Sequence, residues 1–226
     1  MNYYAIIVAG GSGNRMNNPV PKQFLLLDGI PILMHTIQAF NKSVLNPEIL
    51  VVLNKNLHAD WINLCNKYNF SIHHSLVNGG EHRFHSVQNA LAAIEHDGLV
   101  AVHDAVRPLV STALIYKSYL LATKMGNCVA AVSLTDSIRK ISADQSTTSM
   151  DRTLFKLVQT PQTFQVEILR SVYQTEFDSR FTDDASVAEV KGIKINLIEG
   201  ERENIKITYP EDIEIASILL KKKRPS

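Results

Sequence analysis

The sequence predicts a single α/β domain, residues 1–226, with a Rossmann-like, doubly wound and mostly parallel sheet. Short β-branched runs alternate with stretches of helical apolar spacing, which is typical of βαβ units. The first apolar run ends in a glycine-rich loop, the position where such sheets bind ligands. A length of 226 residues with 45% hydrophobic content provides one large core, and no repeat or linker divides the chain.

The elements follow from the local patterns. Residues 3–8 are almost uninterruptedly apolar, like a strand buried on both faces, and Pro31 suits the first turn of a helix ending at residue 40. Further strands are expected at residues 48–53, 70–74, 99–103, 128–134, 194–198 and 204–208. Further helices are expected at residues 57–68, 81–95, 113–125 and 166–176 and from residue 210 onward, with a rigid turn at residues 160–164.

Residues 135–153 interrupt the apolar rhythm with short hydroxyl-rich stretches. This alternating character predicts an extended hairpin arm that projects from the domain. Because such an arm has little core of its own, a second subunit would stabilise it most readily.

Composition argues against several classes of protein. A net charge of +1, with a basic run only at residues 221–224, gives no support for nucleic-acid binding. Cys65 and Cys128 lie in separate apolar patterns without metal-ligand spacing, which suggests reduced thiols in a cytosol. No signal peptide and no apolar run of roughly 18 residues is present, so a cytoplasmic protein without a membrane span is expected.

The glycine-rich loop predicts a phosphate site. Gly10, Gly11 and Gly13 carry no Cβ, so backbone N–H groups can converge on an anion. Arg15 can fork two donors onto phosphate oxygens, and Lys22 adds a mobile charge. The loop lacks the third glycine of a dinucleotide fingerprint and the Gly-Lys-Ser/Thr ending of a P-loop, which leaves a phosphate-binding loop of a third kind.

Two further segments carry polar groups at element ends. Gly80 precedes a helix whose first turn carries polar groups and which continues through Ser86, and free N–H groups at its start would attract an anion or the edge of a base. Asp104 ends a buried strand and either orders a ligand or forms a structural pair with Arg107. His103, next to it, is expected to be a core histidine.

The motifs A-G-G-x-G-x-R-M and P-K-Q-F resemble the signature loop of the cytidylyltransferases, most closely those of the non-mevalonate isoprenoid route. The segments G-G-x-x-R-x-x-S-V, D-R, T-P-Q-x-F, T-D-D-A-S and N-I-K-x-T extend the resemblance to residue 208. It implies transfer of a cytidylyl group from CTP to 2-C-methyl-D-erythritol 4-phosphate, with release of pyrophosphate. It also implies Mg²⁺ or another divalent cation, and a homodimer in which the arm completes the partner's site.

The resemblance also implies residue roles. The catalytic residues would be Arg15, Lys22, Arg152 and Lys206. The nucleotide would be bound by Ala9, Gly10, Gly11, Gly13, Gly80, Ser86, Asp104 and Ala105. The sugar-alcohol phosphate would be bound by Arg107, Ser137, Arg152, Thr182 and Asp183. Asp104 is the one candidate metal ligand.

Several alternatives stay open. Without the resemblance, Arg152 would be a solvated charge, Thr182 and Asp183 only a helix N-cap, and Lys206 an ordinary strand lysine. Arg83 could simply brace the loop that begins at Gly80. A ribitol 5-phosphate cytidylyltransferase shares part of the pattern, as does, more distantly, a nucleotidyltransferase for hexose 1-phosphates. A non-catalytic nucleotide-binding module is the alternative of another class.

Overall fold

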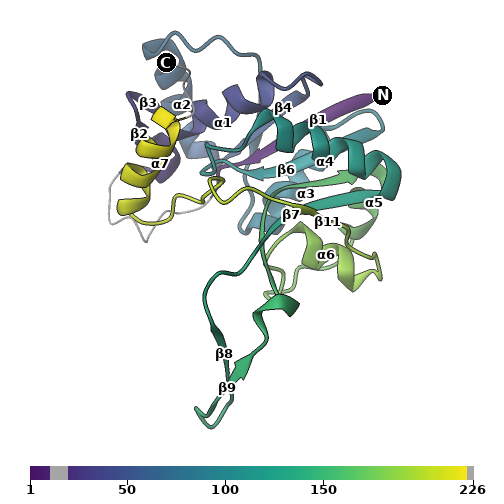
Figure 1. Ribbon diagram of the computed structural model, residues 1–226. Helices are drawn as coiled ribbons and strands as arrows, with labels where there is room; N and C mark the ends of the chain where they lie inside the picture. The colour runs from purple at the N-terminus through teal and green to yellow at the C-terminus, as the bar shows by residue number, and fades with distance from the viewer. Residues whose placement is uncertain (11–19, 223–226) are drawn as a thin grey trace.

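The computed structural model describes residues 1–10 and 20–222, which form a mixed sheet with helices on both faces and a projecting arm (Figure 1). The seven strands follow the order β11-β7-β10-β6-β1-β4-β5. Their bounds are β1 (Asn2–Val8), β4 (Glu48–Leu53), β5 (Ser75–Asn78), β6 (Gly98–Asp104), β7 (Asn127–Ser133), β10 (Lys156–Gln165) and β11 (Leu197–Glu199). Only β10 runs antiparallel to its neighbours in this sheet, so the predicted α/β class with a mostly parallel sheet is confirmed.

Alternation along β1 divides the core between the two faces of the sheet. Ala5 and Ile7 pack in one cluster with α1 and α4, whereas Tyr4 and Ile6 pack in another with α3, α5 and α6. The helices are α1 (Ile32–Asn41), α2 (His58–Lys67), α3 (Arg83–Ala93), α4 (Thr112–Met125), α5 (Val166–Val172), α6 (Asp184–Val190) and α7 (Glu211–Lys222). Because β1 and β6 pair in parallel, with Val8 opposite Asp104, their carboxyl ends lie at the same edge of the sheet.

The strand predicted at residues 70–74 is wrong, because pairing with β4 begins only at Ser75. The apolar residues there serve ring packing instead. Phe70 and His74 both contact the ring of Trp61, whose Nε1 donates to His74 Nε2 at 2.9 Å. An apolar run therefore marked a side-chain cluster and not a strand.

The turn predicted at residues 160–164 is also wrong, because this segment lies inside β10 between β6 and β7. The register of β10 against β7 shifts between Val158 and Gln162, and this irregularity accommodates Pro161 within the sheet. The following helix ends at Val172, four residues before its predicted end.

The two late strands differ from prediction as well. The strand expected at residues 194–198 is β11, displaced to Leu197–Glu199. Residues 204–208 form no strand, although Ile207 N donates to Val106 O at 2.9 Å and holds the segment against the end of β6. This hydrogen bond places Lys206, the preceding residue, at the edge of the sheet.

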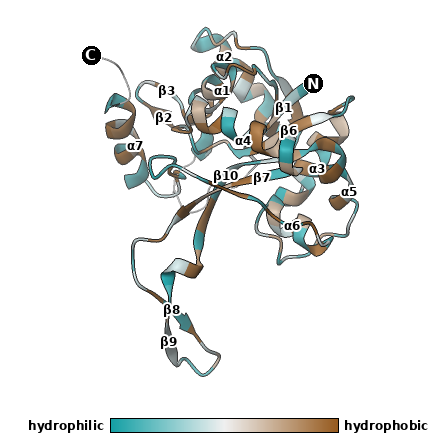
Figure 2. Cartoon of the chain, turned by 45° about the vertical axis from the view of Figure 1, so that its right-hand side comes forward, coloured by the Kyte–Doolittle hydropathy of each residue, from teal (hydrophilic) through white to brown (hydrophobic). Residues whose placement is uncertain are grey.

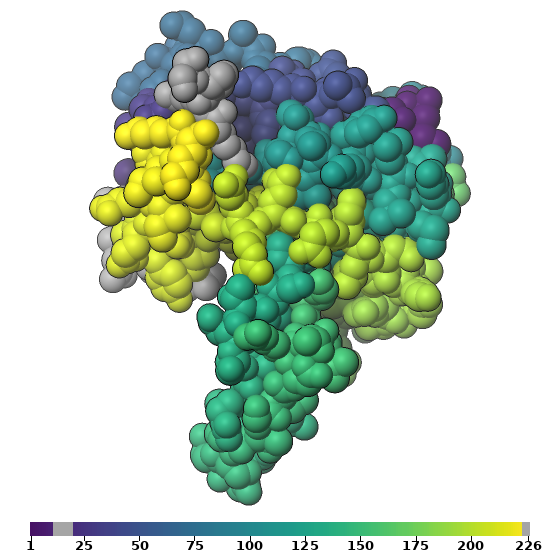
Figure 3. Space-filling view, viewed as in Figure 1, coloured from purple at the N-terminus to yellow at the C-terminus, as the bar shows by residue number. Residues whose placement is uncertain are grey.

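The predicted arm is confirmed as a projecting hairpin. β8 (Ile138–Ile141) and β9 (Thr147–Met150) pair antiparallel with each other and, among the described residues, with no other strand. Figures 1 and 2 show the hairpin extending away from the sheet, and Figure 3 shows it as a separate column of atoms. Small elements complete the fold: β2 (Leu26–Leu27), β3 (Ile30–Pro31) and the 3-10 helices η2 (Lys22–Phe24), η3 (Lys55–Leu57) and η4 (Arg152–Leu154).

Within residues 1–10 and 20–222, no helix has the length and apolar character needed to span a bilayer.

Candidate active site

Two adjoining pockets lie at the carboxyl edge of the sheet. The first has a volume of about 350 Å³ and is lined by Val8, Ala9, Gly10, Lys22, Gln23, Gly80, Glu81, His82, Arg83, Ser86, Asp104, Ala105, Val106 and Lys206. The second has a volume of about 230 Å³ and is lined by Arg83, Asp104, Arg107, Val158, Gln159, Thr160, Gln162, Thr182, Asp183 and Lys206. Arg83, Asp104 and Lys206 belong to both, so the pockets share one wall.

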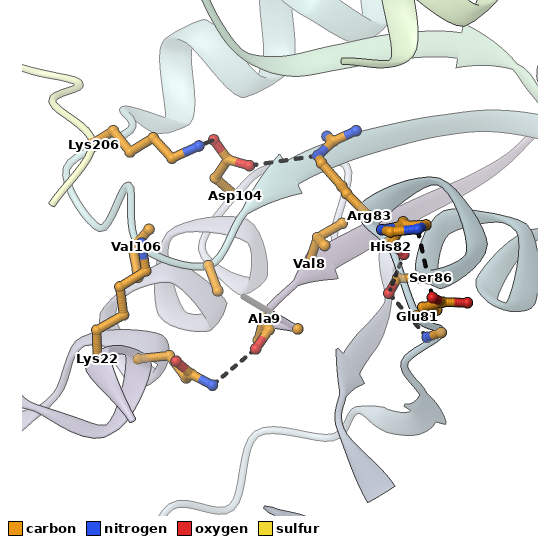
Figure 4. Close-up of a pocket in the computed structure, with 14 residues that line it drawn as sticks. Val8, Ala9, Lys22, Glu81, His82, Arg83, Ser86, Asp104, Val106 and Lys206 are labelled. Carbon is orange, nitrogen blue, oxygen red and sulfur yellow. Dashed lines mark hydrogen bonds and ion pairs between the residues drawn. The ribbon is translucent and has the colours of Figure 1, made fainter. Parts of the chain in front are cut away.

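The start of the glycine-rich loop is fixed by backbone and side-chain hydrogen bonds. Ala9 N donates to Val52 O at 2.9 Å, which continues the ladder beyond β1. The buried side chain of Gln23 donates from Nε2 to Ala9 O at 2.8 Å (Figure 4). The sequence analysis did not assign Gln23 to the site, although Gln23 follows Lys22 in the P-K-Q-F motif and could have been found from it.

Ser86 joins the two glycine segments of the first pocket. Its Oγ accepts from Gly80 N and donates to His82 O, both at 3.1 Å. A Cβ on Gly80 would lie 2.3 Å from His85 Cβ, and a Cβ on Gly10 would lie 3.3 Å from Ser86 Oγ. Gly80 therefore needs to be glycine, a side chain at position 10 would press on Ser86, and the predicted residues Gly10, Gly80 and Ser86 do come together.

Asp104 is surrounded by cations. Its carboxylate lies 3.0 Å from Lys206 Nζ, 3.4 Å from Arg107 Nε and 3.8 Å from Arg83 Nε. Burial alone would raise the pKa of Asp104, but these three cations outweigh burial and hold it well below its usual range. Asp104 is thus both the partner of Arg107 and part of the shared wall, so the two interpretations from sequence are compatible.

A buried ion pair connects this wall to α6. Arg83 donates from both terminal nitrogens to Asp184, at 3.0 and 2.7 Å, and Tyr173 OH donates to the same carboxylate at 2.7 Å. Asp184 is fully buried. Burial opposes the charge of Arg83, but Asp184 outweighs it and raises the pKa of the guanidinium. Arg83 is therefore anchored beside the Gly80 segment by Asp184, a partner that the sequence did not predict.

The second pocket collects the residues expected to bind the sugar-alcohol phosphate. Arg107 Nη1 donates to Asn204 O at 2.7 Å, which holds its guanidinium in the pocket wall. Asp183 caps α6 in a reciprocal capping box with Ser186, so the predicted N-cap is confirmed. Asp183 Oδ2 also accepts from Gln162 Nε2 at 2.8 Å, and Thr182 precedes it in the lining.

His103 is a core histidine, as expected. It is fully buried, contacts Thr160 Oγ1 at 3.0 Å through Nδ1, and contacts Arg107 O at 3.1 Å through Nε2. Burial lowers the pKa of His103 to about 4, so its ring is neutral near pH 7.

The arm residues lie elsewhere. Ser137 and Arg152 are exposed and are absent from the described lining of either pocket. Arg152 Nη1 donates to Thr135 O within the arm. The structure of one chain therefore brings together the predicted residues of the sheet edge, but not those of the arm. Three predicted residues, Gly11, Gly13 and Arg15, lie outside the described residues.

Comparison with known proteins agrees with this geometry. The family model described as "IspD: 2-C-methyl-D-erythritol 4-phosphate cytidylyltransferase" matches residues 3–222. The 2-C-methyl-D-erythritol 4-phosphate cytidylyltransferase of Bacteroides thetaiotaomicron is 46% identical over 220 residues, covering 97% of this chain and 100% of that protein. That of Phocaeicola vulgatus is 44% identical with the same coverage.

Solved structures agree as well. The 4-diphosphocytidyl-2C-methyl-D-erythritol synthase of Anaerococcus prevotii superposes with a TM-score of 0.83 at 28% identity, covering 97% of this chain and 96% of that one. The cytidylyltransferase of Francisella tularensis gives 0.80 at 31% identity, covering 97% and 100%. The chain therefore belongs to the IspD family, the 2-C-methyl-D-erythritol 4-phosphate cytidylyltransferases of the non-mevalonate isoprenoid pathway.

Proposed function

We propose that the first pocket binds CTP and the second binds 2-C-methyl-D-erythritol 4-phosphate. As a member of the IspD family, the chain is a nucleotidyltransferase that makes 4-diphosphocytidyl-2-C-methyl-D-erythritol and pyrophosphate from these substrates. The assignment of pockets rests on one observation: they share Asp104, Lys206 and Arg83. A donor and an acceptor that meet at a common wall are held for reaction without diffusing. The larger volume, about 350 against about 230 Å³, also suits the larger substrate.

The reaction requires two anions to approach. A phosphate oxygen of the sugar alcohol attacks the α-phosphorus of CTP in line, the bond from that phosphorus to the bridging oxygen breaks, and pyrophosphate leaves. Because the attacking oxygen is already anionic, no general base is needed, and the neutral, buried His103 receives no role in proton transfer. Preorganised cations lower the barrier by neutralising the developing charge.

Each cation has a place in this scheme. We assign Lys22 to the triphosphate in the first pocket and Lys206, in the shared wall, to the reacting phosphorus. Arg107 lines the second pocket and faces the incoming phosphate. Arg15, which lies outside the described residues, is proposed to assist Lys22. Arg83 is paired with Asp184, and Asp104 alone faces both Arg107 and Lys206, so this group of side chains keeps an excess of one positive charge.

The IspD family generally uses a divalent metal ion. In residues 1–10 and 20–222, no cluster of three or more carboxylate, histidine or cysteine side chains could hold one. Mg²⁺ commonly binds through one or two carboxylates together with substrate phosphates. Asp104 fits this pattern, because it is ionised and is the carboxylate that the described linings of both pockets share. We propose that it would hold Mg²⁺ beside the phosphates, where the ion would neutralise charge on CTP.

We further propose a homodimer in which the arm completes the partner's site. Three large apolar side chains on or next to the arm are exposed: Ile141 by 65%, Leu154 by 77% and Leu157 by 55%. Large apolar side chains exposed on one projecting segment favour its use as an interaction surface. A second copy would cover it and would receive Arg152 and Ser137 near its second pocket. The single domain and the cytoplasmic location remain predictions.

A panel of pyrophosphate-release assays tests the proposal. Each of the four nucleoside triphosphates is combined with 2-C-methyl-D-erythritol 4-phosphate or ribitol 5-phosphate. We expect turnover with CTP and the methylerythritol phosphate. Higher kcat/KM with ribitol 5-phosphate would favour the ribitol alternative, and CTP binding without any release would favour a non-catalytic module.

A further inference from the structure

The second pocket has one apolar side chain in an otherwise polar lining. Of the ten described residues that form it, nine are charged or polar, and the tenth is Val158. The proposed occupant has the same composition: 2-C-methyl-D-erythritol 4-phosphate carries a phosphate, hydroxyl groups and a single carbon-bound methyl group. A one-to-one match of this kind suggests that the methyl group has a dedicated contact.

The irregularity in β10 explains how Val158 reaches the pocket. Val158 pairs with Ala131 of β7, and the register shifts directly after it, before Gln162. In a regular strand successive side chains face opposite sides, so Val158 and Gln159 could not both face one pocket. Bulged strands bend and redirect side chains, often beside active sites. Here three successive residues, 158–160, line the second pocket.

The polar neighbours of Val158 are held by the protein. Gln159 donates to Glu201 O at 2.9 Å and accepts from Glu201 N at 3.2 Å. Thr160 Oγ1 accepts from Asp104 N at 3.1 Å, and both ends of the Gln162 amide bond to α6 residues. These groups form a fixed wall, whereas Val158 is 44% exposed and is the apolar residue in the described lining of the pocket.

We propose that Val158 is a specificity-determining residue that contacts the 2-C-methyl group of the sugar-alcohol phosphate. The inference rests on the proposed assignment of the second pocket. A methyl group that packs against Val158 removes apolar surface from water, which lowers the free energy of binding. An unbranched substrate keeps the Val158 side chain in contact with solvent. The contact therefore makes the enzyme prefer the branched substrate over its desmethyl analogue, D-erythritol 4-phosphate.

The test measures pyrophosphate release with CTP and either of these two phosphates. Wild type is compared with Val158→Thr, which keeps the shape of valine but replaces a methyl group by a hydroxyl. Val158→Ile keeps the apolar surface and serves as the conservative variant. Val44→Thr is the matched control, since Val44 is 82% exposed in a turn after α1 and lines neither described pocket.

We expect wild type to prefer the branched phosphate by on the order of tenfold in kcat/KM. Val158→Thr should reduce this ratio severalfold by lowering kcat/KM for the branched phosphate alone, with the KM for CTP unchanged. Val158→Ile should keep most of the preference, and Val44→Thr all of it. An equal ratio in wild type and Val158→Thr would overturn the proposal. If wild type turns over CTP with neither phosphate, the proposed function itself is wrong. Turnover with an unchanged ratio in Val158→Thr would instead show that only the role of Val158 is wrong.

Discussion

The sheet edge and the arm hold their predicted site residues in different ways. At the sheet edge, Asp104 meets cations from α3, from the end of β6 and from residue 206, and Arg83 is anchored to the buried Asp184. On the arm, the hairpin of β8 and β9 pairs with itself among the described residues, and Arg152 donates to the backbone oxygen of Thr135 within the arm. One region is preorganised by its own chain, and the other is not.

This difference indicates how the work is divided. Preorganised charges stabilise a transition state because they do not reorient during the reaction. The sheet edge meets that condition within one chain, which is the physical reason for our proposal that CTP binding and the main charge stabilisation occur there. The charges of the arm would be preorganised once a second surface fixes the arm, which is the physical reason for our proposal that the arm acts in a dimer.

The largest expected effect concerns the anchoring of Arg83. Arg83→Ala leaves the carboxylate of Asp184 buried without its bidentate partner, and breaking a buried pair in this way costs about 3–5 kcal/mol. Urea unfolding measures the loss. The matched arm variant is Arg139→Ala, which removes exposed hydrogen bonds to Thr147 and should change stability by no more than about 0.5 kcal/mol. Equal losses in the two variants would contradict the distinction between the regions.

The next effect is catalytic. Lys22→Ala removes a preorganised cation from the first pocket and should lower kcat by on the order of 10²- to 10³-fold. Pyrophosphate release with saturating CTP measures it, and an unchanged thermal midpoint would show that the fold is intact. Lys117→Ala, at an exposed position on α4, is the control and should behave like wild type. Near-normal turnover by a folded Lys22→Ala would remove Lys22 from the mechanism.

The smallest expected effect is the pH dependence of stability at His74, which lies outside the described lining of both pockets. Burial lowers the pKa of His74, whose Nε2 accepts from Trp61 Nε1. Below a pH of about 6.5, the unfolded chain binds a proton at this residue that the folded chain resists, so stability should be lost as pH falls. His74→Gln does not titrate and keeps an acceptor. It should therefore lose less stability than wild type as the pH falls from 7.5 to 5.

Urea unfolding at the two pH values checks this prediction. Val44→Thr, at an exposed and non-titrating turn position, is the control and should follow the pH dependence of wild type. If both variants change equally with pH, the buried ring of His74 is not the cause.

Much of the sheet edge could be predicted because its residues follow strand ends in short local motifs. The glycine loop after β1 and Asp104 at the end of β6 lie at neighbouring carboxyl ends, as parallel pairing requires. The pairing of Arg83 with Asp184 could not be predicted, since 101 positions separate them and a lone arginine does not reveal its partner. Long-range contacts of this type depend on packing that no local pattern reports.

The errors have a similar origin. The pattern at residues 70–74 indicated burial but not the kind of burial, because Phe70 and His74 pack against the ring of Trp61 from α2. Proline at 161 suggested a turn, although an irregular strand can accept proline inside a sheet. The arm was predicted from its composition, whereas the partner that we propose for Arg152 lies on a second chain, where no local pattern reports it.

Mixing two inactive variants tests most directly whether the arm acts across a dimer. Lys22→Ala and Arg152→Ala are co-refolded in equal amounts and assayed for pyrophosphate release, with co-refolded wild type as the reference. Half of the dimers should be mixed, and each would hold one site with an intact Lys22 and an intact Arg152 from the partner. We predict about a quarter of wild-type activity, since one site in four is then complete. A mixture no more active than the two variants measured alone would contradict the account.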